Sequence, residues 1–247
     1  MIWFLPWRDL DHAKQTPWAV YTLMFLNVLA HIVMLMALPI EQEGWFDKFG
    51  LVPANWHAYQ LLTSCFVHAG WMHLIGNMLF LFLLGDLIED TLGPAGMLLL
   101  YFGGGLAGDW VMLAANAGST MPSVGASGCI SALAGAYAVM FFSHPVPVRV
   151  MFLVFPVRTL QVRAFWLLLL WFGADVLHTV TSHGSLGNEG GVNYVAHGIG
   201  FGVGFIVGIA AVMHGVMRRY ERLGNGHPWF GYWPSTLEYA PRRRSRA

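Results

Sequence analysis

Charged residues are scarce in this sequence. Only 11% of its 247 residues are Asp, Glu, Lys or Arg, whereas ordinary soluble domains contain about 25%. The 13 basic and 13 acidic residues also cancel to a formal net charge of zero. Because nucleic-acid binding requires a positive excess on one face of the protein, this balance argues against a nucleic-acid partner.

Cysteine is almost absent as well. The two that occur, Cys65 and Cys129, make no disulfide framework and match no zinc-binding spacing. The sequence also lacks an HExxH string, the ligand pair that a metal-dependent intramembrane protease needs. We therefore predict that the protein uses no metal and no other cofactor.

Hydrophobic residues make up 56% of the chain, and they form long uncharged runs. Residues 18–38 and 192–217 contain no charged side chain, and about 20 mostly apolar residues suffice for a helix to cross a bilayer. Helices satisfy every backbone polar group within the segment, as lipid requires. The sequence thus predicts an all-α polytopic membrane protein with six transmembrane helices, at about 18–38, 71–87, 95–116, 127–143, 164–182 and 194–216.

Basic residues predict how these helices are oriented. If six segments cross, 12 of the 13 basic residues fall on one side and only Lys48 falls on the other. Basic residues are enriched in cytoplasmic segments, so we expect both termini in the cytoplasm. The chain then divides into a cytoplasmic N-terminal segment (1–17), a six-helix core (18–216) and a basic cytoplasmic tail (217–247).

Several polar residues lie at the beginnings of the even-numbered segments. His73 and Asn77 share a face of the second segment because they are four residues apart, Ser127 opens the fourth, and His197 lies one turn into the sixth. With both termini inside, these segment beginnings all lie near the outer face. Polar groups inside the membrane are costly and by default mark a functional site or a satisfied buried contact.

Small residues predict which of these segments touch. The face of the sixth segment that bears His197 continues with Gly200 and Gly204, and small residues also follow Ser127 along the fourth. Such faces let helix backbones approach closely in lipid. We therefore expect the fourth and sixth segments to pack together and Ser127 to meet His197.

A serine beside a histidine can act as a nucleophile with its general base. Acyl transfer also needs donors for the developing oxyanion, and the Asn77 amide, the His73 ring and the backbone N–H groups around Ser127 could supply them. Apart from Glu189 in the preceding loop, no acidic residue lies close in sequence to His197. The pattern therefore predicts a Ser-His dyad.

At these residues the sequence resembles the rhomboid family of intramembrane serine proteases. Three motifs carry the resemblance, in the family's order: HxxxN at residues 73–77, GxSG at 125–128 and AHxxGxxxG at 196–204. The resemblance extends over the six-helix core, and it marks as motif or packing residues Gly125, Gly128, Gly200 and Gly204. Many relatives have an aromatic residue four positions after the nucleophile, where this chain has Ser131.

The resemblance implies a six-helix rhomboid-like bundle that cleaves peptide bonds in or near transmembrane segments, without a metal. Ser127 would be the nucleophile and His197 the base, while His73, Asn77 and the Ser127 backbone N–H would bind the oxyanion. The implied partners are transmembrane protein substrates and the lipid bilayer, and no particular oligomeric state is indicated. We expect an integral protein of a bacterial inner membrane whose active site faces the extracytoplasmic side.

Other interpretations remain open. Taken alone, Ser127 would be assigned as a helix N-cap, a position that serine strongly favours. Asp109 and Asp175 inside predicted spans, with the many histidines, are compatible with an ion-coupled transporter, in which replacing the aspartates would abolish flux and Ser127 would be dispensable. A third possibility is a non-catalytic relative that binds transmembrane helices, although such a protein has no chemical reason to keep both Ser127 and His197.

Overall fold

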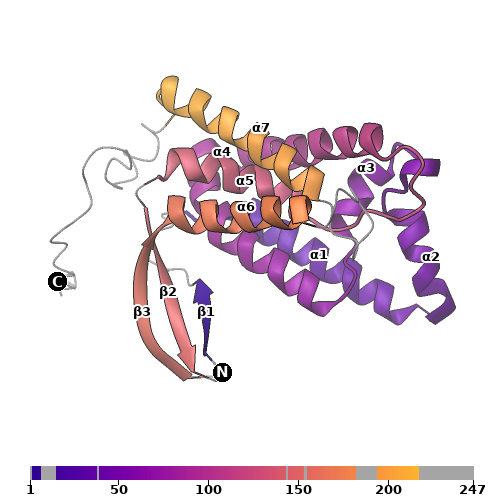
Figure 1. The fold of residues 1–247 in the computed structure, drawn as a ribbon, viewed down its shortest axis with the longest axis horizontal. Coiled ribbons are helices and arrows are strands. Elements are labelled where there is room, and N and C mark those ends of the chain that lie inside the picture. The colour runs from indigo at the N-terminus through magenta and orange to yellow at the C-terminus, as the bar shows by residue number, and fades with distance from the viewer. Residues whose placement is uncertain are drawn as a thin grey trace, which may run out of the picture.

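Figure 1 shows the fold, a computed structural model that describes residues 2–6, 15–37, 39–142, 144–152, 155–181 and 194–216. The tail predicted at 217–247 lies outside the described residues. In chain order the elements are β1 (Ile2–Pro6), α1 (Trp18–Met36), α2 (Pro39–Phe49), η1 (Pro53–Asn55), α3 (Gln60–Thr63), η2 (Ser64–Phe66), α4 (Trp71–Ala115), α5 (Ser127–Met140), β2 (Pro145–Phe152), β3 (Phe155–Arg163), α6 (Ala164–Thr181) and α7 (Tyr194–Met213).

All six predicted segments are helical, and the second and third are the two helices that meet at a kink inside the 45-residue α4. The kink lies between the two predicted ranges: Gly93 has the non-helical angles φ 77° and ψ 166°, a backbone conformation that glycine adopts without steric cost. Three of the described helices, α1, α4 and α7, are long and apolar enough to cross a membrane, whereas α5 is apolar but has only 14 residues. Six separate crossings therefore stay a prediction.

A three-stranded antiparallel sheet corrects the all-α expectation. Its order is β1-β2-β3, with Ile2 opposite Phe152 and Pro145 opposite Arg163. Alternating valines in residues 145–163 are typical of strands, and these residues lie between the predicted fourth and fifth segments. Because β1 pairs with β2, the N-terminal segment and the connection between α5 and α6 lie on the same side of the membrane. This agrees with the even number of membrane crossings predicted between these two parts of the chain.

At the centre of the bundle is α5, in which every residue from Cys129 to Met140 is buried. It packs between α4 and α7, and the three backbones approach closely where small residues face one another. A Cβ atom added to Gly204 would collide with the carbonyl oxygen of Ala132, and one added to Gly135 with that of Phe201. The predicted packing of the fourth segment on the sixth is confirmed.

An acidic side chain anchors the start of α1. No side chain of its own caps this helix, and the two carboxylate oxygens of Glu89 in α4 accept the backbone N–H groups of Ala19 and Val20, each at 3.0 Å. The first N–H groups of a helix have no partner within the helix, and their positive partial charge favours an anion. Glu89 thus fixes α1 against α4.

Candidate active site

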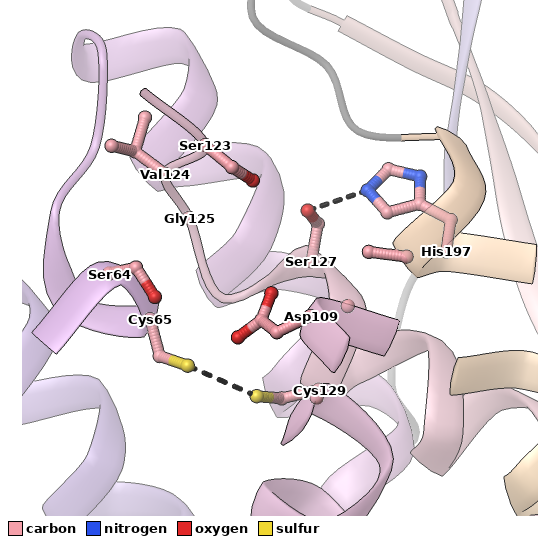
Figure 2. Close-up of a pocket in the computed structure, with 12 residues that line it drawn as sticks. Ser64, Cys65, Asp109, Ser123, Val124, Gly125, Ser127, Cys129 and His197 are labelled. Carbon is pink, nitrogen blue, oxygen red and sulfur yellow. Dashed lines mark hydrogen bonds between the residues drawn. The ribbon is translucent and has the colours of Figure 1, made fainter. Parts of the chain in front are cut away.

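Ser127 and His197 meet at the N-terminal ends of α5 and α7. The Ser127 Oγ and the His197 Nε2 are 2.6 Å apart (Figure 2), within hydrogen-bonding distance for a nucleophile and its base. The His197 side chain is buried, and Ser127 is half-buried. The contact expected between these two residues, 70 positions apart in the chain, is confirmed.

The interpretation of Ser127 as an N-cap is wrong. The cap position belongs to Ala126, and α5 begins at Ser127 with no side-chain cap. The hydroxyl therefore points to His197 and does not bond the helix backbone. As the first residue of the helix, Ser127 has a backbone N–H without an intrahelical partner, at the positive end of the helix dipole. This N–H is suited to bind negative charge that develops on a neighbouring oxygen.

A turn with a positive backbone angle positions Ser127. Gly125, two residues before Ser127, has φ 115°, a region that side-chain-bearing residues rarely adopt. Its N–H donates to the carbonyl oxygen of Ser64 at 2.9 Å. A Cβ at Gly125 would lie 2.8 Å from His73 Nε2 and 3.7 Å from Asn77 Nδ2. Both the backbone angle and the close approach of α4 therefore require glycine here.

His73 and Asn77, from the first two turns of α4, thus face the turn that carries Ser127. The Asn77 amide nitrogen donates one hydrogen bond to the His73 carbonyl oxygen at 3.1 Å. A primary amide has two N–H donors, and this nitrogen also lies close to Gly125 in the turn. The structure brings all four polar residues singled out in the sequence, His73, Asn77, Ser127 and His197, into one cluster.

A third histidine lies next to this cluster. His68, in the connection before α4, is fully buried, and its ring centroid lies 5.1 Å from that of His73. Burial, and secondarily the neighbouring His73, lower the pKa of His68 to about 3. His68 is therefore neutral at physiological pH and adds no positive charge beside His73.

The His197 ring is supported from its own helix. Ser131, at the position where relatives have an aromatic residue, donates its hydroxyl to the Ser127 carbonyl oxygen at 2.8 Å. Tyr194, one turn before His197, instead places its ring 6.0 Å from the imidazole at an interplanar angle of 78°. This edge-to-face arrangement is a favourable aromatic geometry, so an aromatic support exists but comes from a different position.

A pocket opens beside the Ser127–His197 pair, and further side chains reach it (Figure 2). Its lining includes Asp109 from α4, Cys65 from η2 and Cys129 from α5. Asp109 is only 8% exposed. The side chain of Asp175, the other aspartate singled out in the sequence, lies outside the described residues. Nothing in the sequence pattern indicated that the two cysteines share this pocket, because they are 64 residues apart.

Comparison with known proteins agrees with this site. A family model described as "Rhomboid domain" matches residues 55–214, which include all three motifs and the site built from them. The chain belongs to the rhomboid family. Its apolar helices and its family together make it an integral membrane protein.

Two relatives illustrate the similarity. A Bacillus subtilis (strain 168) protein named "Putative rhomboid protease YdcA" is 33% identical over 126 residues, which are 47% of this chain and 55% of the relative. Rhomboid-like protein 11, chloroplastic, from Arabidopsis thaliana is 40% identical over 78 residues, 30% of this chain and 26% of the relative. The matched part of this rhomboid protein thus spans about half or less of each relative's length.

Proposed function

We propose that this rhomboid protein is a serine endopeptidase that cleaves peptide bonds in or near the transmembrane segments of other membrane proteins. The observation that carries the proposal is the 2.6 Å contact between Ser127 Oγ and His197 Nε2. A hydroxyl in this position can lose its proton to the imidazole as it attacks a carbonyl carbon. Membership of a family whose relatives include a protein named as a protease supports the same chemistry.

The reaction would proceed in two acyl-transfer steps. Nε2 of His197 takes the Ser127 proton while Oγ attacks, which requires the other ring nitrogen to hold the ring's own proton. The tetrahedral oxyanion accepts hydrogen bonds from the Asn77 amide, the His73 ring and the Ser127 backbone N–H. His197 then gives its proton to the departing amine, and water, activated by the same imidazole, hydrolyses the acyl-enzyme.

The proposed substrates are single transmembrane helices with a locally weakened stretch. Within a regular helix each carbonyl oxygen accepts a backbone hydrogen bond, and lipid offers no substitute partner. A carbonyl becomes available to Ser127 only where the helix is frayed or interrupted. We propose that the cluster lies toward the extracytoplasmic face, with both termini in the cytoplasm, as the basic residues predict.

The test is cleavage by purified protein in lipid, with a panel of single-span substrates. Replacement of Ser127 or His197 by alanine should lower the cleavage rate by about 10³-fold or more. Ser131→Ala is the matched control, because it removes a serine hydroxyl one turn along the same helix and should keep most of the activity. Labelling of Ser127 by a serine-directed phosphonate should require His197. Unchanged cleavage by Ser127→Ala would exclude the proposal.

A transporter remains the second candidate, because the buried carboxyl of Asp109 lines the same pocket. Ionisable residues inside membranes often mark ion pathways. Reconstituted vesicles separate the two functions: a transporter loses ion flux in Asp109→Asn and keeps it in Ser127→Ala. If the protein is a protease, Ser127→Ala loses cleavage and Asp109→Asn keeps it. Neither substitution then changes ion flux.

A further inference from the structure

The two cysteines of the chain lie side by side in the active-site pocket. Cys65 comes from η2 and Cys129 from the first turn of α5, and their sulfur atoms are 3.4 Å apart (Figure 2). Both thiols are free, and both side chains are buried. The pocket that they line also contains Ser127 and His197. The mechanism above uses neither thiol.

The separation of the sulfur atoms is close to what a disulfide needs. A disulfide bond is about 2.05 Å long, so the sulfurs would have to approach by about 1.4 Å from their present 3.4 Å. In Figure 2 the two side chains already point toward each other. We propose that Cys65 and Cys129 form an oxidisable dithiol site, which reacts with a peroxide and closes to a disulfide that lowers the activity of the enzyme.

The chemistry needs only the two thiols and one peroxide. One sulfur attacks a peroxide oxygen, so that an S–O bond forms, the O–O bond breaks and one water leaves when the oxidant is hydrogen peroxide. The second sulfur then attacks the first, so that the S–S bond forms and the S–O bond breaks with release of a second water. Two electrons pass from sulfur to oxygen, and both thiol protons leave in the water. Hydrogen peroxide is small enough to enter by the pocket that both thiols line.

The position of Cys65 explains why closure would affect catalysis. The Cys129 side chain has little freedom, because its sulfur fills the space where a Cβ at Gly105 of α4 would be. Most of the movement must therefore occur in η2. The neighbouring Ser64 contacts the turn before Ser127, since its carbonyl oxygen accepts the N–H of Gly125 at 2.9 Å.

A shift of η2 would therefore be transmitted through Ser64 to Gly125, and from there to the space between His73 and Ser127. A misplacement of about 1 Å can cost about 100-fold in rate. We expect the disulfide form to cleave substrate about 10- to 100-fold more slowly than the dithiol form, and reduction to restore the rate.

The experiment exposes the purified full-length protein in lipid to hydrogen peroxide and then alkylates the denatured protein with a maleimide. Because the chain has only two cysteines, the expected product is a monomer that has lost the mass of two hydrogen atoms and takes up no maleimide. Proteolytic digestion should give one cross-linked peptide that contains both cysteines. Dithiothreitol should restore both thiols, the cleavage rate and the labelling of Ser127 by the phosphonate.

Matched variants assign the effect. Cys65→Ser and Cys129→Ala each leave a single thiol, which cannot form a disulfide within the chain. Each variant should therefore cleave substrate at the same rate before and after peroxide treatment. If one of them folds poorly, the other still provides the comparison. Three outcomes would each overturn the proposal. They are two alkylatable thiols after peroxide treatment, a disulfide between two chains, and a disulfide-bonded monomer that cleaves substrate as fast as the dithiol form.

This proposal goes beyond the proposed function and fails separately from it. Mass and maleimide uptake report the disulfide even if no substrate is cleaved. Phosphonate labelling of Ser127 reports the coupling of the dithiol to the site without any substrate. If the disulfide forms and Ser127 still reacts with the phosphonate at the same rate, Cys65 and Cys129 are a modification site. The proposed effect of the disulfide on activity is then refuted.

Discussion

Two clusters of polar side chains lie along the first half of α4, and their polar groups contact different parts of the protein. His73 and Asn77 stand at its start and face the turn that carries Ser127. Asp86, Glu89 and Asp90 are at most 6% exposed and begin nine residues later, about 13 Å along the helix axis. Both carboxylate oxygens of Glu89 accept backbone N–H groups of α1, whereas the Asn77 amide nitrogen lies beside Gly125 in the turn before Ser127.

This comparison distinguishes Glu89, which anchors α1 on α4, from His73 and Asn77, which we propose bind the reacting substrate. A buried polar group that has all its partners stabilises the packing of two elements, and its loss leaves those partners unsatisfied. A reacting group must keep some capacity for substrate, so its partners come from elsewhere in the chain and leave one side open. Substitutions in the first cluster should therefore change activity more than stability, and substitutions in the second should do the reverse.

Among the substitutions that test this comparison, Gly125→Ala is expected to give the largest effect. The added methyl group would meet the His73 ring at less than 3 Å, and the backbone angle of Gly125 is unfavourable for alanine. Either the turn or the imidazole must move, and a displacement of about 1 Å at a reacting centre costs about 100-fold in rate. The measurement is cleavage of a single-span substrate in lipid, or the rate of phosphonate labelling of Ser127.

Gly128→Ala serves as the control for that substitution. It lies in the same motif, but its added Cβ would meet Ala196 at an ordinary contact distance of 3.6 Å. It should lose far less activity than Gly125→Ala. Equal losses in the two variants would show that the turn at Gly125 has no special role in holding the cluster.

Glu89→Gln tests the anchoring cluster. Glutamine replaces one of the two accepting oxygens by an NH₂ group, which cannot accept an N–H, and the favourable charge at the start of α1 is lost. We expect a loss of about 1–3 kcal/mol in the free energy of unfolding, measured by denaturation in mixed micelles. The folded fraction should keep its activity. Asp47→Asn, at an exposed acidic residue of α2, should change neither quantity.

The helices and the cluster of His73, Asn77, Ser127 and His197 were predictable because their signals are local or periodic. Uncharged runs define the segments, and the small-residue face that continues from His197 predicts the contact with the segment of Ser127. The three motifs then place four polar residues at one end of their helices. Each of these inferences needs only the identity of nearby residues and the depth at which a segment begins.

What escaped prediction depends on partners distant in the chain. The strand Ile2–Pro6 becomes recognisable only through its pairing with residues 148–152. Glu89 had the appearance of a loop residue until α1 supplied its N–H partners. Cys65 and Cys129 carry no spacing signal, because their proximity results from the packing of η2 on α5. In each case tertiary contact, and not local sequence, decides the role of the residue.

His68 offers the smallest effect and tests whether the region behind the site also anchors the fold. Its pKa is lowered to about 3 by burial, from an ordinary value of about 6.5 in the unfolded chain. Between these values the unfolded state binds more protons than the folded state, so stability falls as the pH falls through this range. Linkage gives a loss of about 1–2 kcal/mol between pH 7 and pH 5.

The measurement is the apparent thermal unfolding midpoint in micelles, followed from pH 7 to pH 5 by tryptophan fluorescence. His68→Gln removes the titrating ring but keeps a polar side chain, so its midpoint should depend less steeply on pH than that of the wild type. His57→Gln is the control, because His57 is exposed and stacks on Tyr59; it should leave the pH dependence unchanged. If His68→Gln and the wild type lose stability in parallel, the acid sensitivity arises from other groups, and His68 does not couple protonation to the fold.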